Sequence, residues 1–458
     1  MITNVAVIGL GKLGASMAAG MASRGFNVVG VDISQHAVDA VNAGKAPVQE
    51  TGLAEMISAN QERIRATMSH EEAICGSDIS FVIVPTPSDE RGSFSIQYAA
   101  YAFREIGKAL AKHPGYHVVV LTSTVLPGST RYALLPILEK YSGKKCGPDF
   151  GLCYSPEFIA LGTVIRDFLN PDFYLIGEFD QKSGDYLEEL DRKVCMKEPI
   201  CRRMTIENAE IAKIALNSYV TMKISFANML ADLCERVPGG DVDAVSDAIG
   251  TDTRIGRKYL TGGLGFAGPC FPRDNVALSY FARQLGSECG LLEKNDHYNR
   301  NLSQRFVEKI QPYIKKGSTV AILGLAYKPL SHVIEESQGI FLARALSDAG
   351  MRVIGYDPLA YEGAKSALQY RTLVTDDIQA CLQDADIILV TTPDKIFLET
   401  PVETYFGKSK EITVIDFWRF LKDKFAHQPG VTYIPIGKCI EPETAGQKVQ
   451  TLWQSFAE

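Results

Sequence analysis

The sequence predicts an α/β protein with two Rossmann-like, doubly wound parallel-sheet domains, joined by a long central helix and a small helical domain. Three observations lead to this fold class. A strand, a glycine-rich turn, a helix and a second strand open the chain, and the same order of elements returns after residue 318. Between them, residues 205–237 contain neither glycine nor proline. We expect domains over residues 1–200, 201–300 and 301–458.

The opening pattern, residues 4–32, contains GLGKLG at the turn from strand to helix. In a GxGxxG turn Gly9 allows the tight bend, Gly11 lets a pyrophosphate approach the backbone, and Gly14 lets helix and strand pack closely. Asp32 closes the second strand, where a carboxylate accepts hydrogen bonds from a ribose 2′-hydroxyl and repels a 2′-phosphate. The pattern therefore predicts an NAD site rather than an NADP site. The alternative is a glycine turn with a structural role only.

Two further apolar runs, at 79–87 and 117–125, predict strands of the same sheet. Ligands of such sheets bind at the carboxyl ends of the strands. Thr86 and Thr124 lie near the ends of these runs, so we expect them at the cofactor crevice. Either threonine could instead be a turn former.

Residues 205–237 are apolar at helical spacing and stop at VPGG, which predicts one long helix. Such a helix is too long for an average domain, so we expect it to link two domains or two subunits. Lys213 and Asn217 are four residues apart and project from one face of the helix. A solvated surface pair is the alternative to a functional one.

The second pattern consists of STVAILGLAYKP (318–329), the helical GIFLARALSDAG, the strand MRVIGYDP and the later strand ADIILVTTP. It repeats the first pattern in order but has GLAYKP in place of GxGxxG. It therefore predicts a second nucleotide-binding fold without a dinucleotide site. This arrangement implies a cofactor on one side, a second nucleotide-bearing molecule on the other, and chemistry between them.

Cys270 stands in GLGFAGPCFPRDN, residues 263–275, between two prolines and after several glycines. Pro272 suits the first turn of a helix, which puts Cys270 at a helix N-terminus, where the dipole and a nearby cation favour the nucleophilic thiolate. The alternative is a small buried hydrophobe, which we expect of most of the ten cysteines. The cysteines form no CxxC pair, so neither a zinc site nor a disulfide framework is indicated.

A net charge of −7 argues against a nucleic-acid partner, because phosphate binding needs a basic face. The first residues lack the basic and apolar regions of a signal peptide, and no apolar run reaches the ~18 residues of a membrane span. We therefore expect a cytoplasmic protein.

Eight motifs, in their joint order, resemble the nucleotide-sugar 6-dehydrogenases, the family of UDP-glucose and GDP-mannose dehydrogenases. They are GLGKLG, VPTP (84–87), STVLPGST (123–130), YSPEF (154–158), the helix with Lys213 and Asn217, TDTRIG (251–256), GFAGPCFPRD (265–274) and GLAYKP (324–329). The resemblance covers almost the full length of the chain. It implies oxidation of a sugar C6 alcohol to a carboxylate, in two hydride transfers to two NAD molecules and through a cysteine thioester. It also implies a homodimer formed through the central helix.

By this resemblance Cys270 is the nucleophile, and Lys213, assisted by Asn217, steadies the alkoxide and later the oxyanion. Asp274 and Thr124 would hold and activate the hydrolytic water, with Glu157 as a further acid or base. The implied cofactor-binding residues are Gly9, Gly11, Lys12, Leu13, Gly14, Asp32, Pro85, Thr86, Thr124 and Arg273. The implied substrate-binding residues are Glu157, Phe158, Lys213, Asn217, Arg254, Tyr259, Gly265, Phe266, Tyr327, Lys328 and Arg419. Of these, Arg254 matches an arginine that reaches the substrate of the other subunit in family dimers.

Several positions depart from the family's pattern. Leu161 stands where the family usually has an acidic residue or arginine, and Glu335 stands where an arginine normally meets the cofactor. Ala37 replaces a basic residue near the adenine ribose. Trp418 replaces an arginine, with Arg419 beside it. These departures bear on cofactor affinity and substrate identity more than on the reaction.

The resemblance leaves the substrate partly open. PEF at 156–158, where relatives acting on N-acetylated sugars tend to have PER, favours an unacetylated hexose. UDP-glucose is preferred, ahead of GDP-mannose and then a modified UDP-hexose, and the sequence does not distinguish uracil from guanine. A β-hydroxyacid dehydrogenase is a second interpretation, but it would need neither the second nucleotide fold nor Cys270. A third is a nucleotide-binding module that has lost turnover, which Glu335 and Ala37 favour.

Overall fold

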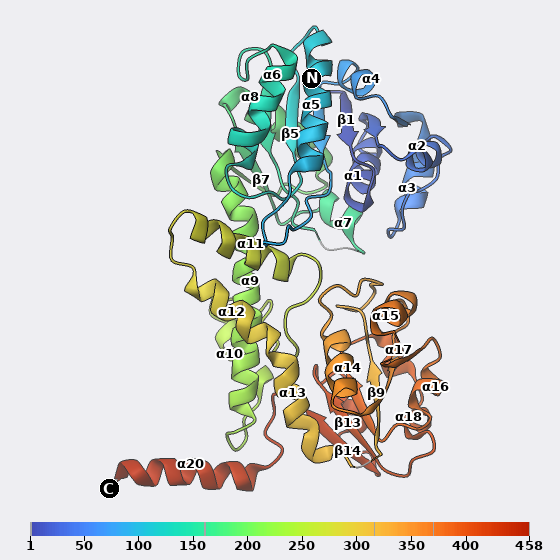
Figure 1. The fold of residues 1–458 in the computed structure, drawn as a ribbon, viewed down its shortest axis with the longest axis vertical. Helices are drawn as coiled ribbons and strands as arrows, with labels where there is room; N and C mark the ends of the chain where they lie inside the picture. The colour runs from blue at the N-terminus through green and yellow to red at the C-terminus, as the bar shows by residue number, and fades with distance from the viewer. Residues whose placement is uncertain (1, 160–161, 316, 370, 458) are drawn as a thin grey trace. The chain divides into compact units, whose positions relative to one another are not determined.

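The computed structural model describes residues 2–159, 162–315, 317–369 and 371–457 (Figure 1). The chain forms two compact units. Unit 1 comprises residues 1–216 and 280–287, and unit 2 comprises residues 217–279 and 288–458. The three-part division near residues 200 and 300 stays a prediction.

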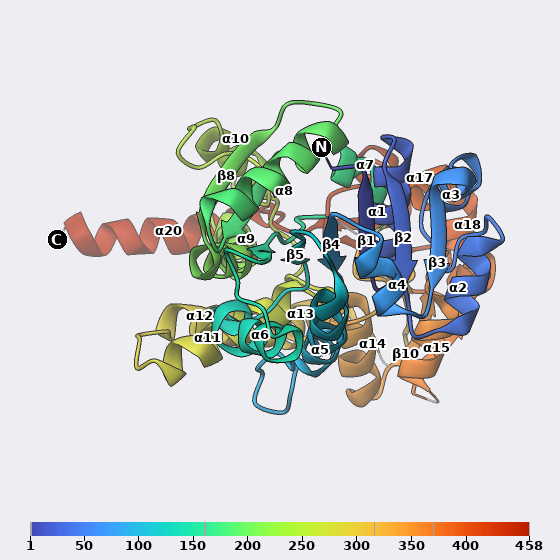
Figure 2. The same cartoon turned by 90° about the horizontal axis from the view of Figure 1, so that it is seen from above.

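Unit 1 is built on an eight-stranded sheet of order β3-β2-β1-β4-β5-β6-β7-β8. Its strands are β1 (Asn4–Ile8), β2 (Asn27–Val31), β3 (Ile64–Thr67), β4 (Ile79–Val82), β5 (Val118–Leu121), β6 (Gly151–Tyr154), β7 (Phe173–Glu178) and β8 (Ile200–Thr205). Figure 2 shows β3, β2, β1, β4 and β5 side by side in this order. All pairs are parallel except β6 with β7, so the last two strands run against the other six.

Helices cover both faces of this sheet, because its apolar residues form two separate cores. The helices are α1 (Lys12–Ser23), α2 (Gln35–Asn42), α3 (Leu53–Ala59), α4 (His70–Cys75), α5 (Gln97–Lys112), α6 (Leu135–Ser142), α7 (Val164–Leu169) and α8 (Gln181–Val194). The strands of the first core read as continuous apolar runs, as expected for a sheet buried on both sides.

The long helix predicted over residues 205–237 is α9 (Ile206–Cys234), with 29 residues. It is about one turn shorter than the apolar stretch, because the chain leaves the helix just before VPGG. Five large apolar side chains of α9 are exposed in the chain as described: Ile211 near its start, and Tyr219, Phe226, Met229 and Leu233 further along.

Unit 2 contains a six-stranded parallel sheet of order β11-β10-β9-β12-β13-β14. Its strands are β9 (Thr319–Leu323), β10 (Arg352–Tyr356), β11 (Leu373–Thr375), β12 (Ile387–Val390), β13 (Ile412–Asp416) and β14 (Val431–Pro435). The order matches that of the first six strands of unit 1. The predicted repeat of a Rossmann-like sheet is therefore confirmed.

The helices of this sheet are α14 (Gln338–Asp348), α15 (Tyr361–Leu368), α16 (Ile378–Leu382), α17 (Lys395–Glu399), α18 (Val402–Phe406) and α19 (Lys422–Phe425). The helices before it are α10 (Val242–Gly250), α11 (Phe271–Gln284), α12 (Gly290–Arg300) and α13 (Leu302–Ile310), and α20 (Pro442–Ala457) follows it. The sheet again separates two apolar cores.

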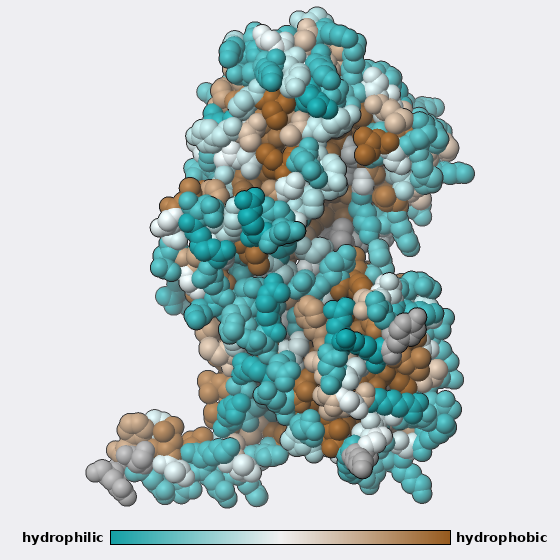
Figure 3. All heavy atoms as spheres, in the orientation of Figure 1, coloured by the Kyte–Doolittle hydropathy of each residue, from teal (hydrophilic) through white to brown (hydrophobic). Residues whose placement is uncertain are grey.

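The surface in Figure 3 is mostly hydrophilic, with apolar side chains gathered on the outer end of α20. Trp453 and Phe456 are the most exposed of them, at 64% and 74%. Among the helices of the described residues, none combines the length and the apolar character that crossing a bilayer requires.

Candidate functional site

The glycine turn of unit 1 has the geometry that the sequence predicts. Gly9 adopts φ +103°, and a Cβ on it would lie 2.1 Å from the carbonyl oxygen of Ile83. A Cβ on Gly14 would lie 1.9 Å from the carbonyl oxygen of Gly9. A Cβ on Gly11 would meet nothing within 4 Å, so this glycine faces open space. The two outer glycines are needed for packing, and Gly11 leaves room for a ligand.

The start of α1 next to this turn suits an anion. Its N-cap residue, Gly11, has no side chain that could accept hydrogen bonds from the N–H groups of the first turn. Lys12 and Leu13, the first two residues of the helix, are half-buried. The Asp32 carboxylate accepts hydrogen bonds from the backbone N–H of Leu10 at 2.7 Å and of Ser34 at 2.8 Å. A helix N-terminus without a side-chain cap, together with a carboxylate at the end of β2, fits the pyrophosphate and ribose of NAD.

The predicted crevice threonines lie at the carboxyl ends of the neighbouring strands β4 and β5. The Thr86 hydroxyl donates to the backbone oxygen of Thr124 at 2.7 Å, and Pro85 beside it is exposed. Glu210 of α9 holds the loop after Thr124. Its buried carboxylate accepts hydrogen bonds from the N–H of Gly128 at 2.5 Å and of Thr130 at 2.9 Å. Sequence reasoning missed Glu210, although it stands one helical turn before Lys213.

Glu157, Phe158 and Lys213 come together in unit 1. The buried Lys213 ammonium donates to the backbone oxygen of Glu157 at 2.5 Å and lies 4.6 Å from the centre of the Phe158 ring. Burial raises the pKa of the Glu157 carboxyl to about 7, against the opposing effect of the Lys213 charge. A carboxyl with this pKa can take or give a proton near neutral pH.

Asp191 of α8 is a second acid near Glu157 that the sequence did not reveal. Burial, and after it the Glu157 charge, raises the pKa of Asp191 well above its usual value. An acid on a helix face between polar neighbours gives no sequence signal, because its burial depends on what packs over it.

Cys270 lies directly before the first residue of α11, as predicted, and is exposed. The N–H of Asp274 donates to the Cys270 backbone oxygen at 2.8 Å, which makes the two residues neighbours across one helical turn. Asp274 is buried, and its carboxylate accepts from the Asn217 amide at 2.6 Å. The Arg273 guanidinium lies 3.5 Å from the other carboxylate oxygen. A thiol, a carboxylate, an amide and a cation are thus assembled within unit 2.

The GLAYKP loop of the second sheet reaches the loop before Cys270. A Cβ on Gly268 would lie 2.6 Å from the Tyr327 ring, and the Gly268 N–H donates to the backbone oxygen of Glu335 at 3.1 Å. Burial, followed by the charges of Cys270 and Glu335, raises the pKa of Tyr327 to about 12. The Lys328 ammonium lies 5.4 Å from the centre of the Tyr327 ring. Tyr327, a predicted substrate residue, therefore lies against the loop that leads to the predicted nucleophile, and Lys328 lies next to Tyr327.

The remaining predicted substrate residues of unit 2 differ in exposure. Arg254 has a side chain that is 86% exposed and paired with Asp252 at 2.6 Å. Tyr259 has φ +68°, and its ring centre lies 6.1 Å from that of Phe271. Gly265 and Phe266 lie in the loop before Cys270.

The residues that depart from the family pattern are placed as follows. Ala37, a residue of α2, is buried in a core of unit 1, so its short side chain has a packing role. The Glu335 side chain is exposed. Leu161 lies outside the described residues.

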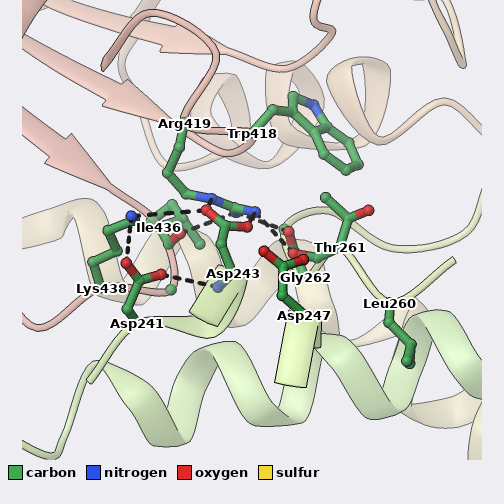
Figure 4. Close-up of polar contacts among 12 residues, drawn as sticks. Asp241, Asp243, Asp247, Leu260, Thr261, Gly262, Trp418, Arg419, Ile436 and Lys438 are labelled. Carbon is green, nitrogen blue, oxygen red and sulfur yellow. Dashed lines mark hydrogen bonds and ion pairs between the residues drawn. The ribbon is translucent and has the colours of Figure 1, made fainter. Parts of the chain in front are cut away.

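Arg419 is buried in unit 2, and Figure 4 shows its guanidinium pointing at α10 and at the loop of Thr261 and Gly262. It pairs with Asp243 at 2.7 Å. Trp418 beside it donates its indole N–H to the backbone oxygen of Thr391 at 2.8 Å. The predicted substrate contact of Arg419 stays a prediction.

A groove of about 710 Å³ lies elsewhere in unit 2, between the end of α9, α13, β14 and the first half of α20. Its lining includes Leu233, Tyr298, Phe306 and Val449. Neither Cys270 nor Tyr327 lines it, so this apolar groove is separate from the residues predicted to act on substrate.

Comparison with known proteins agrees with this geometry. The UDP-glucose/GDP-mannose dehydrogenase family matches with its NAD binding domain at residues 3–195, its central domain at 207–301 and its UDP binding domain at 321–423. UDP-glucose 6-dehydrogenase AglM of Haloferax volcanii is 36% identical over 90% of this chain and 96% of its own length. GDP-mannose 6-dehydrogenase of Pseudomonas aeruginosa is 32% identical over 90% of this chain and 96% of its own length.

A solved structure shows the same architecture. The UDP-glucose dehydrogenase of Pyrobaculum islandicum superposes with a TM-score of 0.85 at 30% identity, covering 96% of this chain and 98% of that one. Together with the glycine turn, the second sheet and the cysteine before α11, these matches show that the chain belongs to the UDP-glucose/GDP-mannose dehydrogenase family and has the family's NAD-binding domain.

Proposed function

We propose that the protein oxidises the C6 hydroxyl of UDP-glucose to the carboxylate of UDP-glucuronate with two NAD, through a thioester on Cys270. One observation carries this proposal: an exposed thiol precedes α11, and one turn further along that helix a buried carboxylate is held by Asn217. A one-step alcohol dehydrogenase has no need of a nucleophilic thiol in this setting.

In the proposed reaction the C6 alcohol loses a proton and a hydride to give an aldehyde, and NAD, when bound, takes up the hydride. Glu157 is suited to receive the proton, because burial brings the pKa of its carboxyl to about 7. The Cys270 thiolate then adds to the aldehyde carbon, and the Lys213 ammonium stabilises the oxygen anion that forms. Loss of a second hydride, which a second bound NAD would take up, leaves a thioester.

Hydrolysis completes the sequence. A water held by Asp274 and Thr124 gives up a proton and adds to the thioester carbon. The carbon–sulfur bond then breaks, which releases the carboxylate and restores the Cys270 thiol. Covalent capture has a clear benefit, because it retains the aldehyde stage while the reduced cofactor is exchanged.

The substrate proposal rests on the relatives and on the second sheet. Relatives named for UDP-glucose and for GDP-mannose match over nearly the same length, so GDP-mannose remains the alternative substrate. Tyr327 and Lys328 are proposed to hold the nucleotide sugar, with Glu157, Phe158, Tyr259, Gly265, Phe266 and Arg254 as further contacts. NAD is proposed to lie on Gly11, Lys12, Leu13, Asp32, Pro85, Thr86 and Arg273.

The test is to incubate the protein with NAD and each of UDP-glucose, GDP-mannose and an N-acetylated UDP-hexose, and to record NADH absorbance. We expect two NADH per carboxylate with UDP-glucose. Turnover with a small β-hydroxyacid, or binding of nucleotide sugar without NADH formation, would contradict the proposal.

We also propose a homodimer formed through α9. Tyr219, Phe226 and Leu233 are exposed at seven-residue intervals, with Met229 three residues after Phe226. This spacing puts the four side chains on one stripe, as in helices that pair along a heptad seam.

Light scattering should give twice the chain mass for the native protein, and the mass of a single chain for Phe226→Glu. If Arg254 completes the site of the second copy, Arg254→Ala should raise KM for the nucleotide sugar and leave NAD affinity unchanged. A fully active monomer would contradict both statements. A cytoplasmic location stays a prediction from the sequence.

A further inference from the structure

The loop of residues 261–268, which leads to Cys270, is held by side chains rather than by a backbone ladder. Asn228 of α9 accepts from the Gly263 N–H at 2.7 Å and donates to the Leu264 oxygen at 3.1 Å. Asn299 of α12 accepts from the Phe266 N–H at 2.8 Å and donates to the Phe266 oxygen at 3.0 Å. Since the loop is neither helix nor strand, its shape depends on these buried amides.

Arg419, at the end of β13, holds the beginning of the same loop. Its guanidinium donates to the backbone oxygens of Gly262 and Thr261, each at 2.8 Å. It also donates to the backbone oxygens of Phe417 at 2.9 Å and Ile436 at 3.1 Å. The guanidinium of Arg419 therefore binds backbone oxygens of the second sheet and of the loop at the same time (Figure 4).

Asp243, in the first turn of α10, completes the contacts of Arg419. Its carboxylate accepts from Nε at 3.1 Å and from Nη2 at 2.7 Å, a two-point contact that fixes the plane of the guanidinium. The Arg419 side chain is only 3% exposed, so its charge depends on this partner. All three guanidinium nitrogens are engaged with protein groups, which leaves little capacity for a ligand.

The backbone of Arg419 is unusual as well. It has φ +56°, a left-handed conformation that costs a non-glycine residue on the order of 1–3 kcal/mol and persists only where the surroundings enforce it. This conformation turns the side chain from the end of β13 toward α10 and the loop. Lysine, with one point charge in place of a planar fork, cannot reproduce the six contacts.

We propose that Arg419, clamped by Asp243, is a positioning residue that fixes the loop carrying Cys270 to the C-terminal sheet, and that it acts on the reaction through this loop rather than by contacting the substrate. Its effect on turnover rests on the proposed function of Cys270. Its effect on the loop does not, and the two are tested separately.

The loop is tested by hydrogen–deuterium exchange with mass spectrometry on the protein without ligands. Arg419→Lys and Asp243→Asn should speed exchange of the amides of residues 261–270 by about tenfold or more. The control is Arg371→Lys, which alters an exposed pair with Asp348 in the same C-terminal fold and should leave these amides unchanged. Asp243→Asn keeps the four carbonyl contacts of Arg419 and replaces only the carboxylate, so it serves as the second, independent variant of the same contact.

Two further measurements separate positioning from substrate contact. In the unliganded variants the rate of Cys270 alkylation by iodoacetamide should change, while that of Cys75, an exposed cysteine of unit 1, should not. The kcat of both variants should fall about 10- to 100-fold, because small misplacement of a reacting group costs that much, and the Kd for UDP should stay within about twofold. Normal loop exchange and normal Cys270 alkylation in both variants would overturn the proposal. If the protein oxidises no nucleotide sugar at all, the proposed function fails while the exchange result still decides the role of Arg419.

Discussion

The two Rossmann-like sheets contain nearly the same turn after their first strand, and they put it to different uses. Gly9 and Gly324 adopt φ +103° and +109°. The Gly9 N–H donates to the Val31 oxygen at 2.7 Å, and the Gly324 N–H donates to the Tyr356 oxygen at 2.8 Å. An acid follows the second strand of each sheet. Asp32 accepts a hydrogen bond from the N–H of Leu10 at 2.7 Å, and Asp357 accepts one from the N–H of Leu325 at 2.8 Å.

The difference lies between the turn and the helix. Gly14 follows Gly9 by five residues, but Gly339, whose Cβ would likewise approach the Gly324 oxygen at 2.3 Å, follows Gly324 by fifteen. The longer connection contains Tyr327, Lys328 and Glu335 and runs to the loop before Cys270.

The N-termini of α1 and α14, the helices that follow the two turns, also differ. In the second sheet Ser337 caps α14 with its own side chain, whereas α1 begins without a side-chain cap. Asp357 is buried and accepts four backbone N–H groups, whereas Asp32 accepts two and is partly exposed. We therefore expect the shared turn to support a phosphate site only where the helix has no side-chain cap and the acid is not fully engaged by the backbone.

The largest effect is expected at the glycine of the helix that packs against the turn, because this glycine lies against a backbone oxygen in both sheets. Gly14→Ala and Gly339→Ala each place a Cβ against a backbone oxygen, at 1.9 and 2.3 Å, so each should destabilise its own unit by about 3 kcal/mol. Calorimetry, with hydrogen exchange to assign each transition to a unit, checks this. Gly363→Ala, which has room in α15, is the control. Equal stability of either variant and the native protein would mean that the packing is not as described.

The next effect separates the two acids. Asp32→Ala should weaken NAD roughly 10- to 100-fold, because a charged hydrogen-bond acceptor for the ribose is lost, and should weaken NADP far less. Asp357→Ala should lower the stability of unit 2 and leave NAD affinity unchanged. Isothermal titration with both cofactors gives the answer. Native protein that reduces NADP as readily as NAD would contradict the role assigned to Asp32.

Gly11→Ala should have a smaller effect on NAD and almost none on folding. The new methyl group meets no protein atom within 4 Å but occupies the space proposed for the pyrophosphate. We expect NAD to bind several-fold more weakly at an unchanged unfolding temperature. A variant that binds NAD as tightly as before would place the cofactor elsewhere. A variant that loses stability would contradict the open space described at Gly11.

The smallest effect concerns the acid of the first unit. Since the pKa of Glu157 is raised from 4.5 to about 7, the folded protein keeps a proton between these pH values that the unfolded chain has released. The free energy of unfolding of unit 1 therefore falls as pH rises from 4.5 to 7. Glu157→Gln should remove about 1 kcal/mol of this fall, less than full linkage would give because the side chain is partly exposed. Denaturant unfolding at pH 5 and pH 8 measures it, with unit 2 as internal control, and an unchanged slope would contradict the raised pKa.

Much of this comparison is present in the sequence. The glycines of the first turn, Asp32, the repeat of strands and Cys270 before a helix all follow from local pattern, because turns, strand periods and helix starts depend on neighbouring residues. The reversal of β7 and β8 does not follow, since an apolar run has no direction.

The contacts of Glu210, Asp191 and Arg419 were also beyond the sequence. Each depends on residues distant in the chain: Arg419 meets Asp243 across 176 positions, and Glu210 meets Thr130 across 80. Such partners are set by packing of whole elements, and no local spacing indicates them.

The most direct test of the thioester is the Asp274→Asn variant. The amide keeps the size of the side chain and an oxygen for Asn217, but cannot take a proton from water, so hydrolysis should slow more than oxidation. Given UDP-glucose and excess NAD, the variant should release about two NADH per active site in a burst and then stall. Intact-protein mass spectrometry should show the nucleotide-sugar acyl group, and peptide mapping should place it on Cys270. An adduct on another cysteine, or a variant that turns over normally with Cys270 unmodified, would contradict the account.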